Sequence, residues 1–147
     1  MWRSASSLDD EVIVRMCLAL NAEDPGPEPV PPDHTQRTLI ALRHEPRRGQ
    51  ALVLEIEGQV CGYALLISYW SNELGGEACA IDEMYVEPEH RSRQHATRLI
   101  EDLAEAWTPR PVALTIEVTP GNTRARALYE RLGFSGGNLA MRRVLRP

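Results

Sequence analysis

The alternation of apolar and polar positions along this chain of 147 residues predicts a short strand, two helices and then a run of strands. The first strand covers residues 2–5, and the first helix is capped by Ser6 or Ser7 and ends near Asn21. A proline-rich loop (23–33) follows, because proline is excluded from helix interiors and central strands. We expect the apolar side of the first helix to consist of Val12, Met16, Leu18 and Leu20.

A second helix over residues 34–44 precedes three strands that form an antiparallel meander. The residues before Gly58-Gln59 alternate apolar and polar side chains, and this pair is a two-residue hairpin turn. From the second helix we expect Leu39, Ile40 and Leu42 to face inward. The strands of the meander are expected at residues 51–57, 60–70 and 78–86.

The last third of the chain predicts helix, strand, helix and strand. An amphipathic helix covers 97–107, with Leu99, Ile100 and Leu103 on one side. A helix over 123–132 ends at Gly133, the residue type that adopts the left-handed conformation after a helix. The two strands are expected at residues 111–118 and 141–145.

The order of elements, β-α-α-β-β-β-α-β-α-β, predicts an α+β fold with a mixed central sheet covered by helices. At this length we expect residues 1–147 to form one domain. Hydrophobic residues make up 43% and charged residues 25%, which is typical of a globular protein. No apolar run is long enough to span a bilayer, and acids stand where a signal peptide needs apolar residues. We therefore expect a cytoplasmic protein that does not bind membranes.

The net charge of −5 argues against nucleic acid as a partner. Every basic residue is Arg, which suits bidentate phosphate contacts, although a coding bias explains the absence of Lys as well. Cys17, Cys61 and Cys79 are expected to be buried small hydrophobes. Cys79 could be a nucleophile, but no His–Asp pattern in the sequence supports this alternative. The four histidines are isolated from one another, so we expect no metal site.

A strand, a basic loop and a helix N-terminus follow one another in residues 81–100, IDEMYVEPEHRSRQHATRLI. The first N–H groups of a helix have no partner within it, and the helix dipole favours negative charge there. Arg91 and Arg93 lie beside that terminus, so the segment predicts a phosphate-binding site. The alternative is a solvated basic turn.

Two motifs in this order resemble the signatures of the GNAT superfamily of N-acetyltransferases. The first is V-x-P-E-x-R-x-R-x-x-A, from Val86 to Ala96, after a strand and before a helix. It departs from the family pattern at Gln94, where the family has Gly, and this departure puts the affinity for the cofactor in question. The second, N-x-x-A-x-x-L-Y-x-x-x-G-F, matches at Asn122, Ala125, Leu128, Tyr129, Gly133 and Phe134.

The resemblance implies that acetyl-CoA is the co-substrate. In the family, the pantetheine arm binds along the strand that precedes the loop, because the next parallel strand splays away from it. The Val86 N–H would polarise the thioester carbonyl, and Tyr129 would be the general acid for the leaving thiolate. The residues expected to bind the cofactor are Met84, Tyr85, Val86, Arg91, Ser92, Arg93, Gln94, His95, Ala96, Thr97 and Asn122.

Asp82 and Glu83 are the candidates for the base that takes the proton of the amine. As neighbours on a strand they are expected to point to opposite faces, so that only one faces the acceptor. We prefer Asp82, because residues two positions apart share a face of a strand and Asp82 therefore lies on the face of Met84 and Val86. Glu83 or a water chain is the alternative base. Either acid could also simply pair with an Arg.

The resemblance places the acceptor between the first two helices, their loop and the hairpin. Tyr69, Trp70, Asn72 and Glu73 could form an aromatic and acidic pocket for a cationic amine there, or a solvated hairpin tip. We expect acetyl transfer to a small primary amine by direct attack in a ternary complex. The alternatives are an aminoglycoside-type acetyltransferase, a non-catalytic acyl-CoA-binding module and an enzyme that acetylates protein N-termini or Lys. A homodimer is possible.

Overall fold

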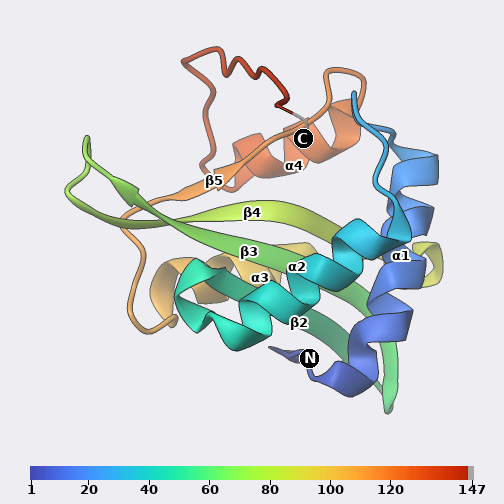
Figure 1. The fold of residues 1–147 in the computed structure, drawn as a ribbon. Coiled ribbons are helices and arrows are strands. Elements are labelled where there is room, and N and C mark those ends of the chain that lie inside the picture. The colour runs from blue at the N-terminus through green and yellow to red at the C-terminus, as the bar shows by residue number, and fades with distance from the viewer. Residues whose placement is uncertain (146–147) are drawn as a thin grey trace.

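The computed structural model describes residues 1–145, which form one five-stranded sheet with helices on both faces (Figure 1). The strands lie in the order β1-β2-β3-β4-β5, antiparallel throughout except for β5, which runs parallel to β4. The predicted α+β fold with a mixed sheet is therefore confirmed. The strands are β1 (Trp2–Ser4), β2 (Gly49–Ile56), β3 (Gln59–Ser71), β4 (Gly76–Val86) and β5 (Leu114–Ile116).

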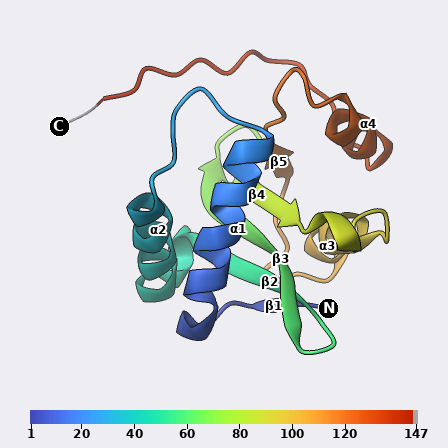
Figure 2. The ribbon, with the colours of Figure 1, turned by 90° about the vertical axis from the view of Figure 1, so that its right-hand side faces the viewer.

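The helices divide between the two faces of the sheet. Figure 2 shows α1 and α2 on one side, and α3 with α4 on the other. Single turns of 3₁₀-helix, η1 (Ser7–Asp9), η2 (Pro46–Arg48) and η3 (Pro88–His90), precede α1, β2 and the loop before α3. The helices are α1 (Asp10–Glu23), α2 (Pro32–His44), α3 (His95–Glu105) and α4 (Thr123–Arg131).

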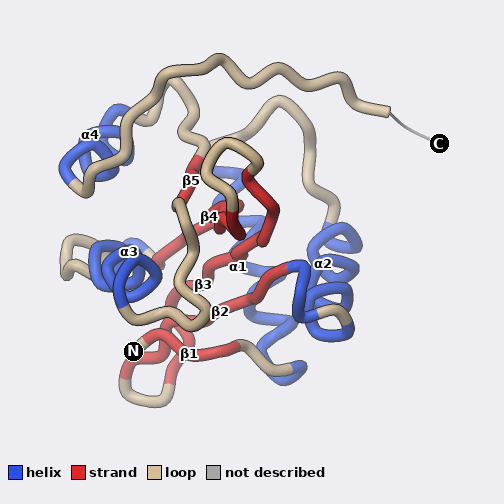
Figure 3. The backbone as a smooth tube through the Cα atoms, turned by 90° about the vertical axis from the view of Figure 1, so that its left-hand side faces the viewer, coloured by secondary structure: helices blue, strands red, loops and turns tan. Residues whose placement is uncertain are grey.

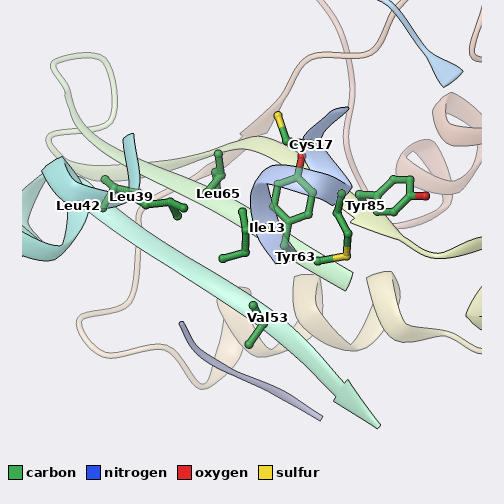
Figure 4. Packing of buried hydrophobic residues seen from close by; sticks show 9 residues of the cluster. Ile13, Cys17, Leu39, Leu42, Val53, Tyr63, Leu65 and Tyr85 are labelled. Carbon is green, nitrogen blue, oxygen red and sulfur yellow. The ribbon is translucent and has the colours of Figure 1, made fainter. Parts of the chain in front are cut away.

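Each face of the sheet has its own hydrophobic core. Figure 4 shows the first, in which Ile13 of α1 and Leu39 of α2 pack against Val53 and Tyr63 of the sheet. The second lies under α3, whose predicted inward residues are all buried there. Tyr129 and its neighbours after α4 pack at the edge of this second core.

The inward sides of the first two helices differ from the expected ones at two residues. Leu18 is 45% exposed and Ile40 is 50% exposed. The helical period explains the difference, because Ile13, Met16 and Cys17 are spaced to share one stripe, and this stripe is the one that α1 buries. Of the cysteines, Cys17 and Cys61 are buried and Cys79 is partly buried.

The two parallel strands diverge beside the middle of β4. The pairing of β4 with β3 continues to Val86, whereas its pairing with β5 ends at Ile81. The β3–β4 register shifts at this point, so that Leu65 pairs with Glu83 and Leu66 with Ile81, and Asp82 between them has no partner. This is a β-bulge, which bends a strand and redirects its side chains. The second half of β4 therefore borders an opening instead of another strand.

The predicted last strand at 141–145 is wrong. Residues 135–145 have no regular secondary structure, and Leu139 and Met141 are more than 85% exposed. Figures 2 and 3 show this segment running as an extended loop over one end of the sheet. A strand needs a neighbour to pair with, and the adjacent Arg142 and Arg143 interrupt the alternation that one buried face requires.

No helix within residues 1–145 is long and apolar enough to cross a membrane.

Candidate functional site

A crevice of about 300 Å³ opens where β4 and β5 diverge. Its walls come from the end of α1 and the loop after it, from β4, from the segment after β5 and from α4. The bulge and the splay create this space, because the second half of β4 has no neighbour on its β5 side. Of the residues predicted from the sequence, the crevice brings together Asp82, Glu83, Met84, Asn122 and Tyr129.

Both acids of β4 line this crevice, although the alternation of a regular strand predicted only one of them there. The bulge at Asp82 accounts for the difference, because it breaks the period of two. Desolvation and the nearby Glu117 raise the pKa of Asp82. Burial also raises the pKa of Glu83, which accepts hydrogen bonds from Tyr63 and Cys17. A raised carboxyl pKa makes each group a better base for the proton of an ammonium ion.

Tyr129 projects from α4 into the crevice and is half-buried. Its ring packs edge-on against Phe134, with 5.8 Å between the centroids. Asn122 caps α4, since its Oδ1 accepts a hydrogen bond from the N–H of Ala125 at 3.2 Å. Burial raises the pKa of Tyr129, so the phenol keeps its proton at neutral pH. The second motif thus supplies a fixed, protonated phenol.

The loop before α3 adopts an unusual backbone at the position where the family has Gly. Gln94 has φ 63° and ψ 21°, in the left-handed region, and Ser92 also has a positive φ of 61°. Gln94 is therefore not in the right-handed helical region, in which its own N–H would be available to a phosphate. The Gln94 side chain forms no cap, so it leaves the first N–H groups of α3 available to an anion.

Arg91 is engaged with the protein in this structure. Its two terminal nitrogens donate to both carboxylate oxygens of Glu23 at 2.5 and 2.8 Å, and its Nε donates to the Val86 carbonyl at 2.7 Å. The guanidinium also lies 5.3 Å from the centre of the Tyr85 ring. This pairing lowers the pKa of Glu23. Arg91 therefore links the end of α1 to β4, a contact that no sequence pattern predicts.

Other arginines remain beside the N-terminus of α3. Arg93 is exposed, and it forms no ion pair among the described residues. Arg124, which sequence reasoning missed, donates from Nη2 to the Ser92 hydroxyl at 2.7 Å. Its place two residues after Asn122 in the second motif was the signal that could have found it. These two cations and the helix terminus form a positive surface suited to phosphate.

Asp24 is a second residue that the sequence did not reveal. At the end of α1, it accepts a hydrogen bond from the Thr119 hydroxyl at 2.7 Å and another from Asn122 at 3.3 Å. It also lines the crevice. Its position in the proline-rich loop carries no chemical signal, because only the fold brings it to Asn122.

The remaining predicted residues lie around this centre or away from it. Tyr85 is buried and packs on Tyr63, with 6.3 Å between the ring centroids. His95 begins α3; its Nε2 is buried without a partner among the described residues, and burial lowers its pKa. Ala96 and Thr97 continue the first turn of α3. Tyr69, Trp70, Asn72 and Glu73 lie at the β3–β4 hairpin, and none of them lines the crevice.

Within residues 1–145, no group of three or more His, Cys, Asp and Glu side chains is placed to hold a metal ion.

A mixed sheet that splays beside a helix N-terminus, with a phenol and carboxylates in the opening, is the arrangement that the resemblance to the acetyltransferases implied. The model of the Acetyltransferase (GNAT) family matches residues 14–134, and the chain belongs to this family. No curated protein sequence matches the chain.

Solved structures support the fold. A possible acetyltransferase from Clostridium difficile 630 has a TM-score of 0.82 at 21% identity, with 100% of this chain and 97% of that chain covered. A ribosomal-protein-alanine N-acetyltransferase from Brucella melitensis biovar Abortus 2308 has a TM-score of 0.72 at 20% identity, with 99% of each chain covered. An aminoglycoside N-acetyltransferase in complex with CoA has a TM-score of 0.77 at 16% identity, with 100% and 95% covered.

Proposed function

We propose that this protein transfers the acetyl group of acetyl-CoA to a primary amine of a small molecule, by direct attack in a ternary complex. The observation that carries the proposal is the crevice between β4 and β5, in which the Tyr129 phenol faces the same space as Asp82 and Glu83. An acid and a base in one opening are what amide formation from an ammonium ion and a thioester requires. The CoA-bound aminoglycoside N-acetyltransferase of the same fold adds support.

In this proposal the cofactor would run along Met84, Tyr85 and Val86, with its phosphates at the first turn of α3. Arg93 and Arg124 would then hold the phosphates, because Arg91 is paired with Glu23. Acetyl-CoA supplies the activated acyl group. The residues of this chain position it, remove the proton of the amine and return a proton to the departing sulfur.

Calorimetric titration of acetyl-CoA into the wild type and into the Arg124→Ala variant tests the cofactor site. Arg124→Ala should weaken binding by roughly tenfold, since a charge-assisted hydrogen bond to phosphate is worth about 1.5 kcal/mol. The matched control is Arg126→Ala on the same helix, whose guanidinium pairs with Glu130 at the surface. Equal affinities for acetyl-CoA in the two variants would show that the phosphates bind away from Arg124. If the wild type does not bind acetyl-CoA, the proposal is wrong.

The phenol is tested by turnover. Tyr129→Phe should lower kcat by about 10 to 10³ while the affinity for acetyl-CoA stays within about twofold, because a positioned acid acts on the chemical step. The acceptors to screen are ethanolamine, putrescine, spermidine and kanamycin, with release of free thiol as the readout. Unchanged turnover in this variant would exclude Tyr129 from the mechanism.

An aminoglycoside or another polyamine is the second candidate acceptor. Asp24 and Glu117 line the crevice together with Asp82 and Glu83, and among the described residues Arg142 is the basic residue that lines it. This balance favours an acceptor with more than one positive charge. A kcat/KM for kanamycin or spermidine at least about tenfold above that for ethanolamine would support it.

A further inference from the structure

Glu83 is held by a buried hydrogen-bond network on the side of β4 that faces α1. Its Oε1 accepts from the Tyr63 hydroxyl at 2.9 Å and from the Cys17 thiol at 3.5 Å. Tyr63 is fully buried and Cys17 is 1% exposed. Figure 4 shows how Tyr63 of β3 points toward Cys17 of α1. Two donors from two elements therefore fix one oxygen of this carboxylate.

The direction of the thiol proton follows from the rest of the network. Thr35 of α2 donates from its hydroxyl to the Cys17 sulfur at 3.2 Å, and Asn21 donates its amide to the same sulfur at 3.5 Å. The sulfur is thus an acceptor on those sides, and its own hydrogen is directed to Glu83. Burial raises the pKa of Cys17 and that of Tyr63, so both groups remain protonated donors.

The network supplies Glu83 with hydrogen bonds but with no cation. Glu83 forms no ion pair within residues 1–145, and its Oε2 accepts no hydrogen bond there. A carboxylate taken out of water is costly unless it is paired. Glu83 also lines the crevice, whereas Asp82 has no hydrogen-bonded support among the described residues.

We propose that Glu83 is the carboxylate that receives the acceptor's ammonium group, and that Tyr63 and Cys17 are positioning residues that hold it for proton transfer. This inference rests on the proposed function, because it needs an amine that attacks acetyl-CoA. One ammonium proton moves to Oε2, and the freed lone pair forms the C–N bond to the acetyl carbon. The C–S bond breaks and the sulfur takes the Tyr129 proton. The second proton that the nitrogen sheds restores the phenol, and Glu83 releases its proton to water.

The ionisation of Glu83 responds to charges on every side of the crevice. The Tyr63 and Cys17 hydrogen bonds favour the carboxylate and lower the Glu83 pKa, while burial and Asp82 raise it. Removal of either donor should therefore raise that pKa and move the acidic limb of the rate profile to higher pH. Among the described residues, the other charged or titratable groups that line the crevice are Asp24, Glu28, Asp82, Glu117, Tyr129 and Arg142.

The test is the pH dependence of kcat/KM at saturating acetyl-CoA, with the amine of the screen that the wild type acetylates fastest. Near pH 6, Tyr63→Phe and Cys17→Ala should lower kcat/KM by roughly three- to tenfold, and near pH 9 by less than about twofold. Cys17→Ser keeps a donor and should restore the wild-type limb. Cys61→Ala removes another buried thiol, away from Glu83, and should leave the profile unchanged.

A second pair of variants separates the two acids. Glu83→Gln should lower kcat by about 10² or more at every pH, and Asp82→Asn by less than about tenfold. The inference is overturned if Asp82→Asn gives the larger loss. It is also overturned if Tyr63→Phe and Cys17→Ala lower the melting temperature but keep the wild-type pH profile, since the network would then be only structural.

NMR titration of the Glu83 carboxyl carbon makes the outcome independent of turnover. The apparent pKa of this carboxyl should be higher in Tyr63→Phe than in the wild type. A wild type that binds no acetyl-CoA and acetylates no amine would remove the proposed function, and with it the catalytic role of Glu83. An unchanged Glu83 titration in Tyr63→Phe would instead show that the network does not hold this carboxylate.

Discussion

Gln94 holds a backbone conformation that glycine adopts at lower cost. Its φ of 63° brings the Cβ close to the following carbonyl, which costs about 1 kcal/mol for a residue other than Gly. Gln94→Gly should therefore raise the free energy of unfolding by about 1 kcal/mol and the melting temperature by about 2 to 4 °C. Thermal melting followed by circular dichroism measures both.

The matched control for this prediction is Gln36→Gly. Gln36 is exposed in the middle of α2, so the same substitution should cost about 1 kcal/mol there. A loss of stability at both positions would show that the turn before α3 is not strained at Gln94. If Gln94→Gly also binds acetyl-CoA more tightly than the wild type, the glutamine side chain hinders the phosphates.

At the scale of an element, the start of α1 depends on one buried carboxylate. Asp9 accepts from both terminal nitrogens of Arg3 at 2.9 and 3.0 Å and from the Ser6 N–H at 2.7 Å. The Arg3 hydrogen bonds lower the pKa of Asp9. The stabilisation is therefore present above the carboxyl's unfolded pKa, near 4, and it is lost as the pH falls through the lower folded value. Asp9→Asn should cost about 1 to 2 kcal/mol at pH 7.

Urea unfolding at several pH values checks this prediction. The difference in stability between wild type and Asp9→Asn should shrink as the pH falls below about 4, because the wild-type carboxyl then also becomes neutral. Asp33→Asn is the control, since the Arg37–Asp33 pair is exposed and should contribute less than about 0.5 kcal/mol. A difference that stays constant down to pH 2 would contradict the role of the Asp9 charge.

Most elements could be predicted from the sequence because their signals are local. The alternation around Gly58-Gln59 and the cap at Asn122 depend on residues that are close together in the chain, and the structure has these elements within a few residues of the expected positions. The bulge at Asp82 has no such signal, since it follows from how β4 pairs with β3 and leaves β5. The strand expected at 141–145 was wrong because the pattern of a strand says nothing about whether a partner is available.

The candidate site likewise has a part that sequence motifs predict and a part that only the fold brings together. Tyr129 and the loop before α3 could be found because their motifs are contiguous in the sequence. The Glu23–Arg91 pair joins residues 68 positions apart, and Tyr63 meets Glu83 across two strands, so no spacing reveals either contact. The aromatic and acidic residues of the hairpin, Tyr69 and Glu73 among them, are compatible with an acceptor pocket or with a solvated tip, and in the structure they lie outside the crevice.

At the scale of the whole molecule, the end of α1 connects the two sides of the crevice. Glu23 is paired with Arg91, whose Nε donates to the Val86 carbonyl at the end of β4. The next residue, Asp24, is hydrogen-bonded to Thr119 and Asn122 between β5 and α4. The sheet itself does not join β4 and β5 beyond Ile81. These side-chain contacts therefore bridge an opening that the backbone leaves unpaired.

A ligand that fills this opening should stabilise the entire fold, because it would add contacts between segments that only side chains now connect. Acetyl-CoA at 100 times its dissociation constant should raise the free energy of unfolding by about 2.7 kcal/mol. For a chain of 147 residues, this corresponds to a rise in melting temperature of roughly 8 °C. Differential scanning fluorimetry measures the shift, and AMP, which has no pantetheine arm, is the control. The same small shift with both ligands would mean that only the basic loop binds, and that the crevice between β4 and β5 does not hold the acetyl-bearing arm.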